Sequence, residues 1–199
     1  MVSWINFGVL VASALLMLYF YVRSVSPAAL EVKLGEAAYA RCKRDRVIAS
    51  AFEGIAAATY IVYYFYPLPV SLPRTFPWSW WVSLAIAVII AIPAGYLLWR
   101  GIKDAGQETI GPVKERGLYG GIYEKIRHPQ ALGEVAYWWV IAFVLHSPFL
   151  ALFSVVWLPI FYAFCWAEEK DLVIRYGEPY VEYRRRTGLV IPRRKQRDE

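Results

Sequence analysis

Long apolar runs alternate with short polar segments over the whole of this 199-residue chain. A helix needs about 20 mostly apolar residues to cross the hydrocarbon core of a membrane, and residues 4–22, 47–66 and 78–99 each supply such a run. Two further runs, 131–145 and 148–166, meet at the letters HSP, residues 146–148, and predict a tight antiparallel helical hairpin. The pattern predicts an all-α, polytopic membrane protein with five transmembrane helices. The first arm of the hairpin is short for a full crossing, so it either starts inside the membrane face or lies where the bilayer is thinned.

The composition agrees with a membrane protein and excludes an ordinary soluble domain. The hydrophobic fraction is 58% and the mean hydropathy is +0.36, whereas soluble domains average about 45–50% apolar residues. Cys42 and Cys165 offer neither the spacing of metal ligands nor a disulfide framework, so no metal site is expected. The first apolar run has no basic segment before it and no small-residue cleavage site, which favours a retained span over a cleaved signal peptide.

Basic residues gather on one side of the predicted spans. Segments 23–46, 100–130 and 167–199 contain six, six and nine Lys or Arg residues, and the remaining one of the 22 is Arg74. Loops rich in Lys and Arg stay in the cytoplasm. The protein is therefore predicted to lie in the cell membrane with its N-terminus on the outer side and its C-terminus on the cytoplasmic side. Aromatic residues near the span ends fit the interfacial belts of such a protein.

Segment 23–46 allows two interpretations. Ser26 and Pro27 suit the N-cap and the first position of a helix, which would end near Gly35 and lie at the membrane interface. The alternative is a basic loop on an anionic membrane surface, which implies no chemistry.

Candidate chemistry lies in three segments on the predicted cytoplasmic side. The first, residues 111–130, holds four glycines and places Arg127, His128 and Pro129 ahead of an apolar helix. Proline suits the first position of a helix, and the free N–H groups and positive dipole at such a start favour a carboxylate or phosphate. Taken alone, Arg127 can equally be a basic residue that snorkels to the interface, and His128 a simple helix cap.

The second segment contains Glu168 and Glu169, which are predicted to leave the last span at a helix C-terminus, where the helix dipole disfavours carboxylates. The pair therefore needs compensation, for example as a bidentate acceptor toward a sugar diol, or else it is a solvated helix end. The third segment is a tail in which tyrosines and arginines interleave: Tyr176, Tyr180, Tyr183, Arg184, Arg185 and Arg186. A surface-bound basic tail is its simpler interpretation.

The order of these segments resembles the integral-membrane methyltransferase family, which includes isoprenylcysteine carboxyl methyltransferases and phospholipid methyltransferases. The resemblance rests on RHPQALGE, followed after the hairpin by EEKDLVIRYGEPYVEYRRRTG, and it covers residues 111–193. The closest likeness is to a prokaryotic or archaeal member of the isoprenylcysteine carboxyl methyltransferase branch. The chain is thus expected to comprise a three-span membrane region, residues 1–99, and a cofactor-binding region, residues 100–199. The resemblance implies that the second region forms a cytoplasmic pocket for S-adenosylmethionine, closed by the tail.

The resemblance also implies roles for individual residues. The cofactor-binding residues that it assigns are Leu118, Tyr119, Gly120, Ile122, Tyr123, His128, Pro129, Glu168, Glu169 and Tyr180. Tyr180, Tyr183 and Arg186 match the family's Tyr-x-x-Tyr-x-x-Arg pattern. The catalytic residues that it implies are Arg127, Arg186 and Glu168. Family tails of the carboxyl-methylating type often read Arg-Val-Pro-Thr-Gly, whereas this tail reads RTGLVIP, so Arg185 is the alternative to Arg186.

The implied function is methyl transfer from S-adenosylmethionine, by direct in-line displacement, to a lipid-like acceptor such as the carboxylate of a prenylcysteine-type substrate. A carboxyl group titrates near 4 and needs no general base, and an arginine is the side chain suited to dock it. A phospholipid amine is the alternative acceptor and would need a proton acceptor such as Glu168, Glu169 or His128. The expected partners are a lipophilic or prenylated substrate and membrane lipid, with no nucleic acid, for a protein that acts as a monomer.

Two other classes of protein fit less well. A sterol-reductase-like enzyme that uses NADPH has a similar C-terminal region but usually has more spans. A non-enzymatic scaffold or transporter subunit would carry buried ionisable residues along a pathway through the bilayer. The strong candidates within spans, Glu53 and Glu134, both lie near predicted cytoplasmic ends.

Overall fold

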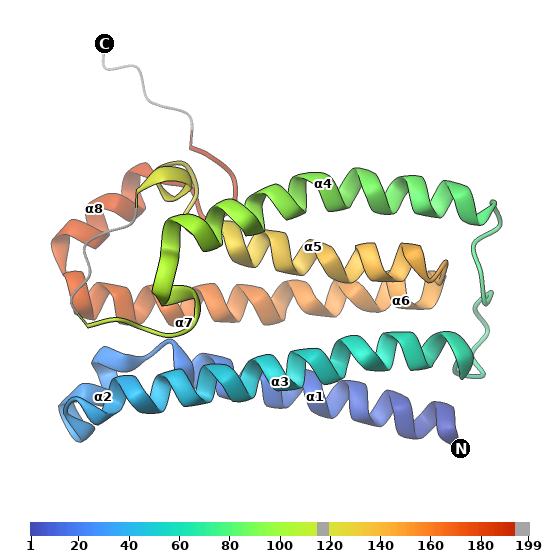
Figure 1. The fold of residues 1–199 in the computed structure, drawn as a ribbon, viewed down its shortest axis with the longest axis horizontal. Coiled ribbons are helices and arrows are strands. Elements are labelled where there is room, and N and C mark those ends of the chain that lie inside the picture. The colour runs from blue at the N-terminus through green and yellow to red at the C-terminus, as the bar shows by residue number, and fades with distance from the viewer. Residues whose placement is uncertain (115–119, 194–199) are drawn as a thin grey trace, which may run out of the picture.

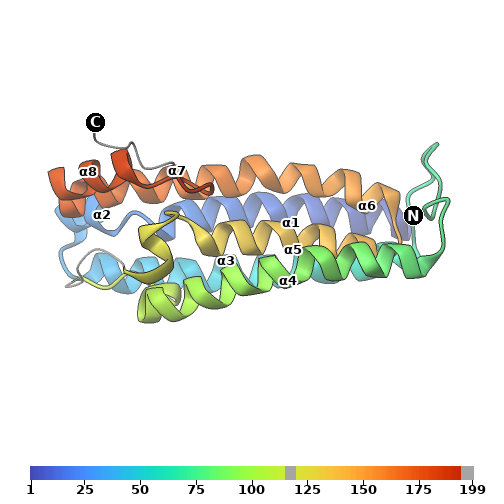
Figure 2. The ribbon, with the colours of Figure 1, turned by 90° about the horizontal axis from the view of Figure 1, so that it is seen from above.

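The apolar runs fold into helices that lie side by side in one elongated bundle (Figures 1 and 2). The computed structural model describes residues 1–114 and 120–193, and within these ranges no β-strand element occurs. The elements are α1 (Val2–Ser24), α2 (Pro27–Leu34), α3 (Ala37–Phe65), α4 (Trp80–Ala105), η1 (Gly106–Thr109), η2 (Gly121–Glu124), α5 (Pro129–Val144), α6 (Pro148–Phe153), η3 (Ser154–Val156), α7 (Trp157–Tyr176) and α8 (Glu178–Arg186). The prediction of an all-α fold is confirmed.

Four of the described helices are long and apolar enough to cross a membrane: Val2–Ser24, Ala37–Phe65, Trp80–Thr109 and Pro148–Tyr176. The other predicted span, α5, has 16 residues, and a helix of that length is about 24 Å long, shorter than a hydrocarbon core of about 30 Å. A count of five complete spans is therefore not confirmed. In both ribbon views α5 nevertheless runs alongside the long helices (Figures 1 and 2).

α3 begins well before the apolar run that predicted it. Ala38, Cys42 and Ala49 are buried and continue one helical face from the basic segment into the apolar one. Packing of this small-residue face therefore extends the helix beyond the part that hydropathy alone marks as a span.

α7 also extends further than its apolar run, as far as Tyr176, where Gly177 ends it with a φ of +61°. A left-handed residue at this position is a common helix terminator, and glycine adopts it without a steric penalty. The prediction that Glu168 and Glu169 stand at a helix C-terminus is therefore wrong. They lie inside α7, about two turns before its end, where the dipole argument does not apply.

The predicted hairpin is present, and α5 begins at Pro129 as predicted. Its corner is built by His146, which has a φ of 53°, and by Ser147, whose hydroxyl oxygen accepts a hydrogen bond from the Leu150 N–H at 3.3 Å. This cap starts α6, which continues through η3 into α7 as one helical rod. The rod is the second arm of the hairpin and packs against the first arm, α5.

The basic segment after α1 contains a helix at the predicted place, α2, which starts at Pro27 and stops at Gly35 with a φ of 56°. The Ser26 side chain does not cap this helix, because its hydroxyl bonds back into α1. Instead, the Ala29 N–H donates to Asp171 Oδ1 of α7 at 3.1 Å. The long-range cap thus ties α2 to α7.

Two glycines allow α4 and α5 to approach closely. A Cβ atom on Gly101 would lie 2.6 Å from Gln130 Cγ, and one on Gly133 would lie 2.7 Å from the Ala94 carbonyl oxygen. Small residues at helix contacts of this kind are typical of membrane bundles, where backbones pack directly against each other. The contact holds the first turns of α5 in a fixed position against α4.

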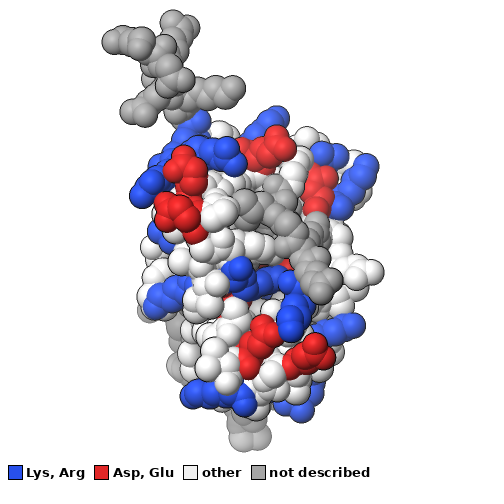
Figure 3. All heavy atoms as spheres, turned by 90° about the vertical axis from the view of Figure 1, so that its left-hand side faces the viewer, with Lys and Arg blue, Asp and Glu red and all other residues white. Residues whose placement is uncertain are grey.

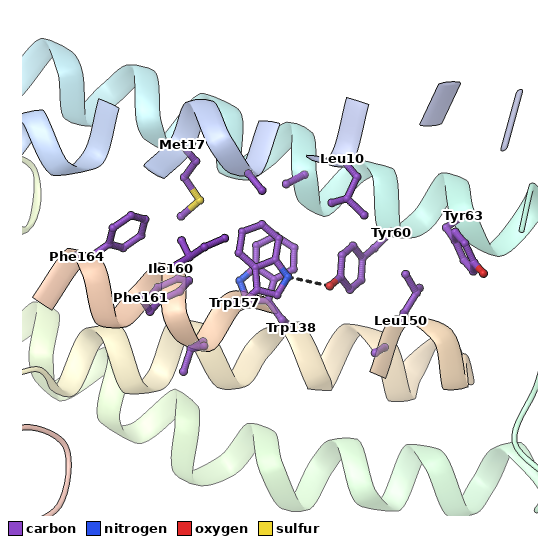
Figure 4. Close-up of a cluster of buried hydrophobic side chains, with 14 of the residues drawn as sticks. Leu10, Met17, Tyr60, Tyr63, Trp138, Leu150, Trp157, Ile160, Phe161 and Phe164 are labelled. Atoms are coloured by element: carbon purple, nitrogen blue, oxygen red, sulfur yellow. Dashed lines mark hydrogen bonds between the residues drawn. The ribbon is translucent and has the colours of Figure 1, made fainter. Parts of the chain in front are cut away.

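Aromatic packing joins α3, α5 and α7 at the centre of the bundle (Figure 4). The Trp138 and Trp157 rings stack with their centroids 3.7 Å apart, and the Trp157 indole N–H donates to the Tyr60 hydroxyl at 2.8 Å. All three side chains are buried, and the hydrogen bond satisfies the indole donor in an apolar surrounding.

Charged side chains gather where α2, α8 and the last turns of α7 lie, at the left of Figure 1, and Figure 3 shows this face directly. We call this part of the bundle the charged end; it comprises the described residues of segments 23–46, 100–130 and 167–193. All three segments that the charge distribution predicted on one side of the membrane therefore meet at the same end.

Candidate active site

A polar cavity of about 50 Å³ lies at the charged end, between α1, α3, α5, α7 and α8. The polar side chains in its wall include Arg46, Glu108, His128, Gln130, Glu168 and Tyr180. The cavity thus collects acidic, basic and aromatic side chains from both halves of the chain.

Glu169 connects three basic side chains behind the cavity wall. Its Oε1 atom accepts a hydrogen bond from Arg127 Nε at 2.6 Å and lies 3.2 Å from His128 Nε2. Its Oε2 atom lies 3.6 Å from Arg184 Nε. Only 11% of the Glu169 side chain is exposed, so its contacts with Arg127 and His128 form a buried ionic network. Its carboxylate is committed to these partners.

The tail is fastened to the residues that precede α5. The Arg127 guanidinium donates to the Thr187 carbonyl, the Arg127 backbone N–H donates to Gly188 O at 2.9 Å, and the His128 N–H donates to Leu189 O at 3.1 Å. These two N–H groups are therefore engaged by tail carbonyls rather than left open for an anion. The tail closes one side of the site through backbone contacts.

Glu168 differs from its neighbour in sequence. Its carboxylate lines the cavity, its side chain is 30% exposed, and its Oε2 atom lies 3.5 Å from His128 Nδ1. One carboxylate of the predicted pair therefore faces the cavity, while the other, Glu169, holds the surrounding residues together.

His128 is buried between both carboxylates and the Cys165 thiol. Burial by itself lowers the pKa of His128, but hydrogen bonds to Cys165, Glu168 and Glu169 outweigh it and raise the pKa well above its usual value. The raised pKa favours the cationic form of His128, which balances part of the negative charge of the two glutamates.

Replacing His128 with glutamine is expected to remove a pH-dependent contribution to stability. Because the pKa of His128 is raised above the value of about 6.5 in an unfolded chain, the contribution is fully present below that pH and is lost as pH rises through the folded pKa. Thermal unfolding in detergent should show the advantage of the wild type over His128→Gln shrinking as pH rises above about 6.5. An advantage that grows with pH would contradict this.

The predicted loop residues occupy different positions. Ile122 and Tyr123 are buried, and the Tyr123 hydroxyl donates to Gly101 O at 3.2 Å and accepts from Gln130 Nε2 at 2.8 Å. Tyr123 lines the cavity, whereas Ile122 does not, and Gly120 is exposed. Leu118 and Tyr119 lie outside the described residues.

The predicted tail residues also divide. Tyr180 and Tyr183 are buried and line the cavity, and Tyr183 donates to Tyr123 O at 2.6 Å. Arg186 is exposed at the end of α8, and Arg185 is exposed beside Glu182, so the structure brings neither arginine to the cavity. Pro129 is buried but does not line it.

It was not predicted from the sequence that the N-terminal half of the chain and η1 contribute side chains to the cavity. Tyr21 and Arg46 line the cavity, and Glu108 in η1 pairs with Arg175 at 2.9 Å, with both side chains almost fully buried. Hydropathy and charge counts carry no information on long-range contacts, so they mark such residues only as the ends of spans. The small buried residues one and two turns from Arg46 were the available signal that this face of α3 points inward.

An apolar groove of about 390 Å³ lies next to the cavity, between α5, α7 and the tail. Its walls include Leu132, Val135, Phe161, Tyr162, Cys165 and Val190, and no charged side chain among the described residues lines it. The groove and the polar cavity share Ala131. Cys165 in the groove wall is also a neighbour of His128 in the cavity wall, so an apolar space and a polar one adjoin.

Two comparisons with known proteins gave a match. Residues 106–179 match the family model described as phospholipid methyltransferase. Over 106 residues the chain is 27% identical to methanethiol S-methyltransferase 2 of Bradyrhizobium diazoefficiens, an alignment that covers 53% of this chain and 37% of the relative. The chain therefore spans little more than a third of the curated relative that it matches. No solved structure matches the chain. The findings support an integral-membrane methyltransferase family, as the sequence predicted.

Proposed function

We infer that this chain, which both matches support as a membrane methyltransferase, transfers a methyl group from S-adenosylmethionine to a lipid-like acceptor. The acceptor that we favour is the carboxylate of a prenylcysteine-type molecule. The observation that carries the proposal is the junction of the polar cavity and the apolar groove at Ala131. A charged, water-soluble cofactor and an apolar acceptor need such a junction in order to meet.

The side chains around the cavity fit this cofactor chemically. Glu168 offers a partly exposed carboxylate to an ammonium group or a ribose diol, and Tyr21 and Tyr180 offer aromatic rings. When bound, S-adenosylmethionine supplies an electrophilic methyl group on a sulfonium. Ligand pockets usually measure about 300–1,000 Å³, whereas this cavity measures about 50 Å³. We therefore propose that the tail moves outward to admit the cofactor.

The task of the protein toward a carboxylate acceptor is to bind it, orient it and exclude water. A carboxylate is ionised at neutral pH, so no side chain has to remove a proton, and a fixed geometry lowers the barrier. We favour Arg127 over Arg186 as the docking cation, because Arg127 lines the cavity and its orientation is fixed by Glu169. The acceptor's apolar part would lie in the groove.

A thiol is the second candidate for the acceptor. The relative named above is a methanethiol S-methyltransferase, and the described residues that line the groove include no charged side chain that would recognise an ionic head group. A thiol must lose its proton before or during transfer, and Glu168 is the carboxylate placed to accept it.

We also propose that the charged end faces the cytoplasm, as the basic segments predict.

Calorimetric titration of the detergent-purified protein tests the cofactor. Micromolar binding of S-adenosylhomocysteine, and none of NADPH, is expected. Binding of NADPH alone would refute the proposal in favour of a reductase.

The acceptor is tested with radiolabelled S-adenosylmethionine and either N-acetyl-farnesylcysteine or a long-chain alkanethiol. A base-labile methyl ester supports the carboxylate, and a base-stable thioether formed only from the thiol supports the second candidate.

A further inference from the structure

Arg46 brings a positive charge into the cavity from α3, outside the region that the family model matches. It lies one turn after Cys42 on the inward side of that helix. Unlike the exposed Arg44, it is directed to the space between the helices.

The contacts of Arg46 are with neutral groups. Its Nε atom donates to Ser24 Oγ at 2.8 Å, its Nη1 atom lies 3.5 Å from the Thr109 carbonyl oxygen, and its guanidinium carbon lies 4.6 Å from the centre of the Tyr21 ring. Within residues 1–114 and 120–193, no carboxylate lies close enough to form an ion pair with it. By contrast, the guanidinium of Arg127 is paired directly with a carboxylate at 2.6 Å.

Glu168 lines both the cavity and a small adjoining space that Arg46 also lines. The two side chains are close enough for their charges to interact, although they are not in contact. An acid and a base separated in this way are complementary to an amino acid group, in which a carboxylate and an ammonium are attached to one carbon.

We propose that Arg46 binds the carboxylate of the methionine portion of the cofactor, while Glu168 binds its ammonium group. The inference rests on the proposed function, because it assumes that the cavity holds S-adenosylmethionine. A guanidinium fork matches a carboxylate in geometry and forms strong, charge-assisted hydrogen bonds. Stacking on Tyr21 and the bond to Ser24 hold the fork in position before the ligand arrives.

The position of Arg46 favours a carboxylate of the cofactor over one of the acceptor. The apolar groove is lined by α5, α7 and the tail, and no residue of α3 contributes to it. A head group that enters through the groove would first meet His128 and Arg127, whereas Arg46 lies on the side of the cavity formed by α1 and α3.

Two ligands that differ only in the amino acid portion test the inference. S-adenosylhomocysteine carries the carboxylate, and 5′-methylthioadenosine lacks it. For Arg46→Gln, calorimetry should show S-adenosylhomocysteine bound about 10- to 100-fold more weakly, the usual effect of losing a hydrogen bond to a charged group, with 5′-methylthioadenosine unchanged. Arg46→Lys should fall in between, because lysine keeps the charge but not the fork. Arg44→Gln, on the exposed face of α3, should match the wild type.

The results that would contradict the inference can be told apart from one another. An equal loss of affinity for both ligands would show that Arg46 only maintains the shape of the cavity, and unchanged affinity for both would show that it does not contact the ligand. Either result refutes the inference while S-adenosylhomocysteine binding by the wild type still supports the proposed function. If the wild type does not bind S-adenosylhomocysteine, the proposed function fails together with the inference.

Discussion

Replacing Glu169 with alanine is expected to lower the free energy of unfolding by about 3–5 kcal/mol, the usual result of removing one partner of a buried ionic network. The substitution leaves Arg127 and His128 buried without the carboxylate that compensates their charge. It also removes the partner that orients Arg127 toward the Thr187 carbonyl. The tail should therefore detach, and limited proteolysis should cleave it after α8 faster than in the wild type.

Glu168→Ala is the matched control, since it removes a carboxylate from the adjacent position of the same helix. Glu168 is 30% exposed and makes one contact of 3.5 Å with His128, so stability should change little, and the tail should remain protected. Binding of S-adenosylhomocysteine should instead be weakened. Equal destabilisation by both substitutions, measured by thermal unfolding in detergent, would contradict the division of roles between the two glutamates.

Gly133→Ala is expected to destabilise the protein by about 1–3 kcal/mol through overpacking of the contact between α4 and α5. Its Cβ atom would lie 2.7 Å from Ala94 O and 2.9 Å from the backbone nitrogen of Leu98. Backbone atoms cannot rotate away as a side chain can, so the two helices have to separate. Because Gly133 lies about one turn after Pro129, the shift should also displace His128 and weaken cofactor binding.

Gly54→Ala gives the opposite expectation and serves as the control. A Cβ atom on Gly54 would meet nothing within 4 Å, and alanine is favoured over glycine in a helix by about 1 kcal/mol. The free energy of unfolding should therefore stay the same or rise slightly. The stability of both variants is measured by unfolding them in a detergent titration. A Gly133→Ala protein as stable as Gly54→Ala would refute the close contact between α4 and α5.

The membrane helices were predictable because burial in lipid imposes a simple requirement on sequence. Each apolar run had to be long, and proline and glycine marked the starts of α2 and α5 and the end of α2. The family motif likewise singled out Glu168 and His128, and both line the cavity of the candidate site. These predictions depend only on local sequence.

Features that depend on distant contacts were not predictable in the same way. Hydropathy ended the last span at residue 166, but α7 continues to Tyr176, which changes the setting of both glutamates. The different roles of Glu168 and Glu169 follow from a rotation of about 100° between successive residues of a helix. Sequence alone did not reveal which of the two would face Arg127. Arg46 was counted only as a positive charge, because its neighbouring small residues indicate an inward face but not that it shares a cavity with Glu168.

The pairing of Gly188 and Leu189 with Arg127 and His128 imposes an order on the biogenesis of the protein. During synthesis, Glu169 leaves the ribosome before residue 189 does, so the ion pair of Arg127 with Glu169 can form before the backbone pairing of the tail. The backbone pairing has to wait until residue 189 emerges. A nascent chain can thus contain paired helices and still lack the tail contacts that close one side of the cavity.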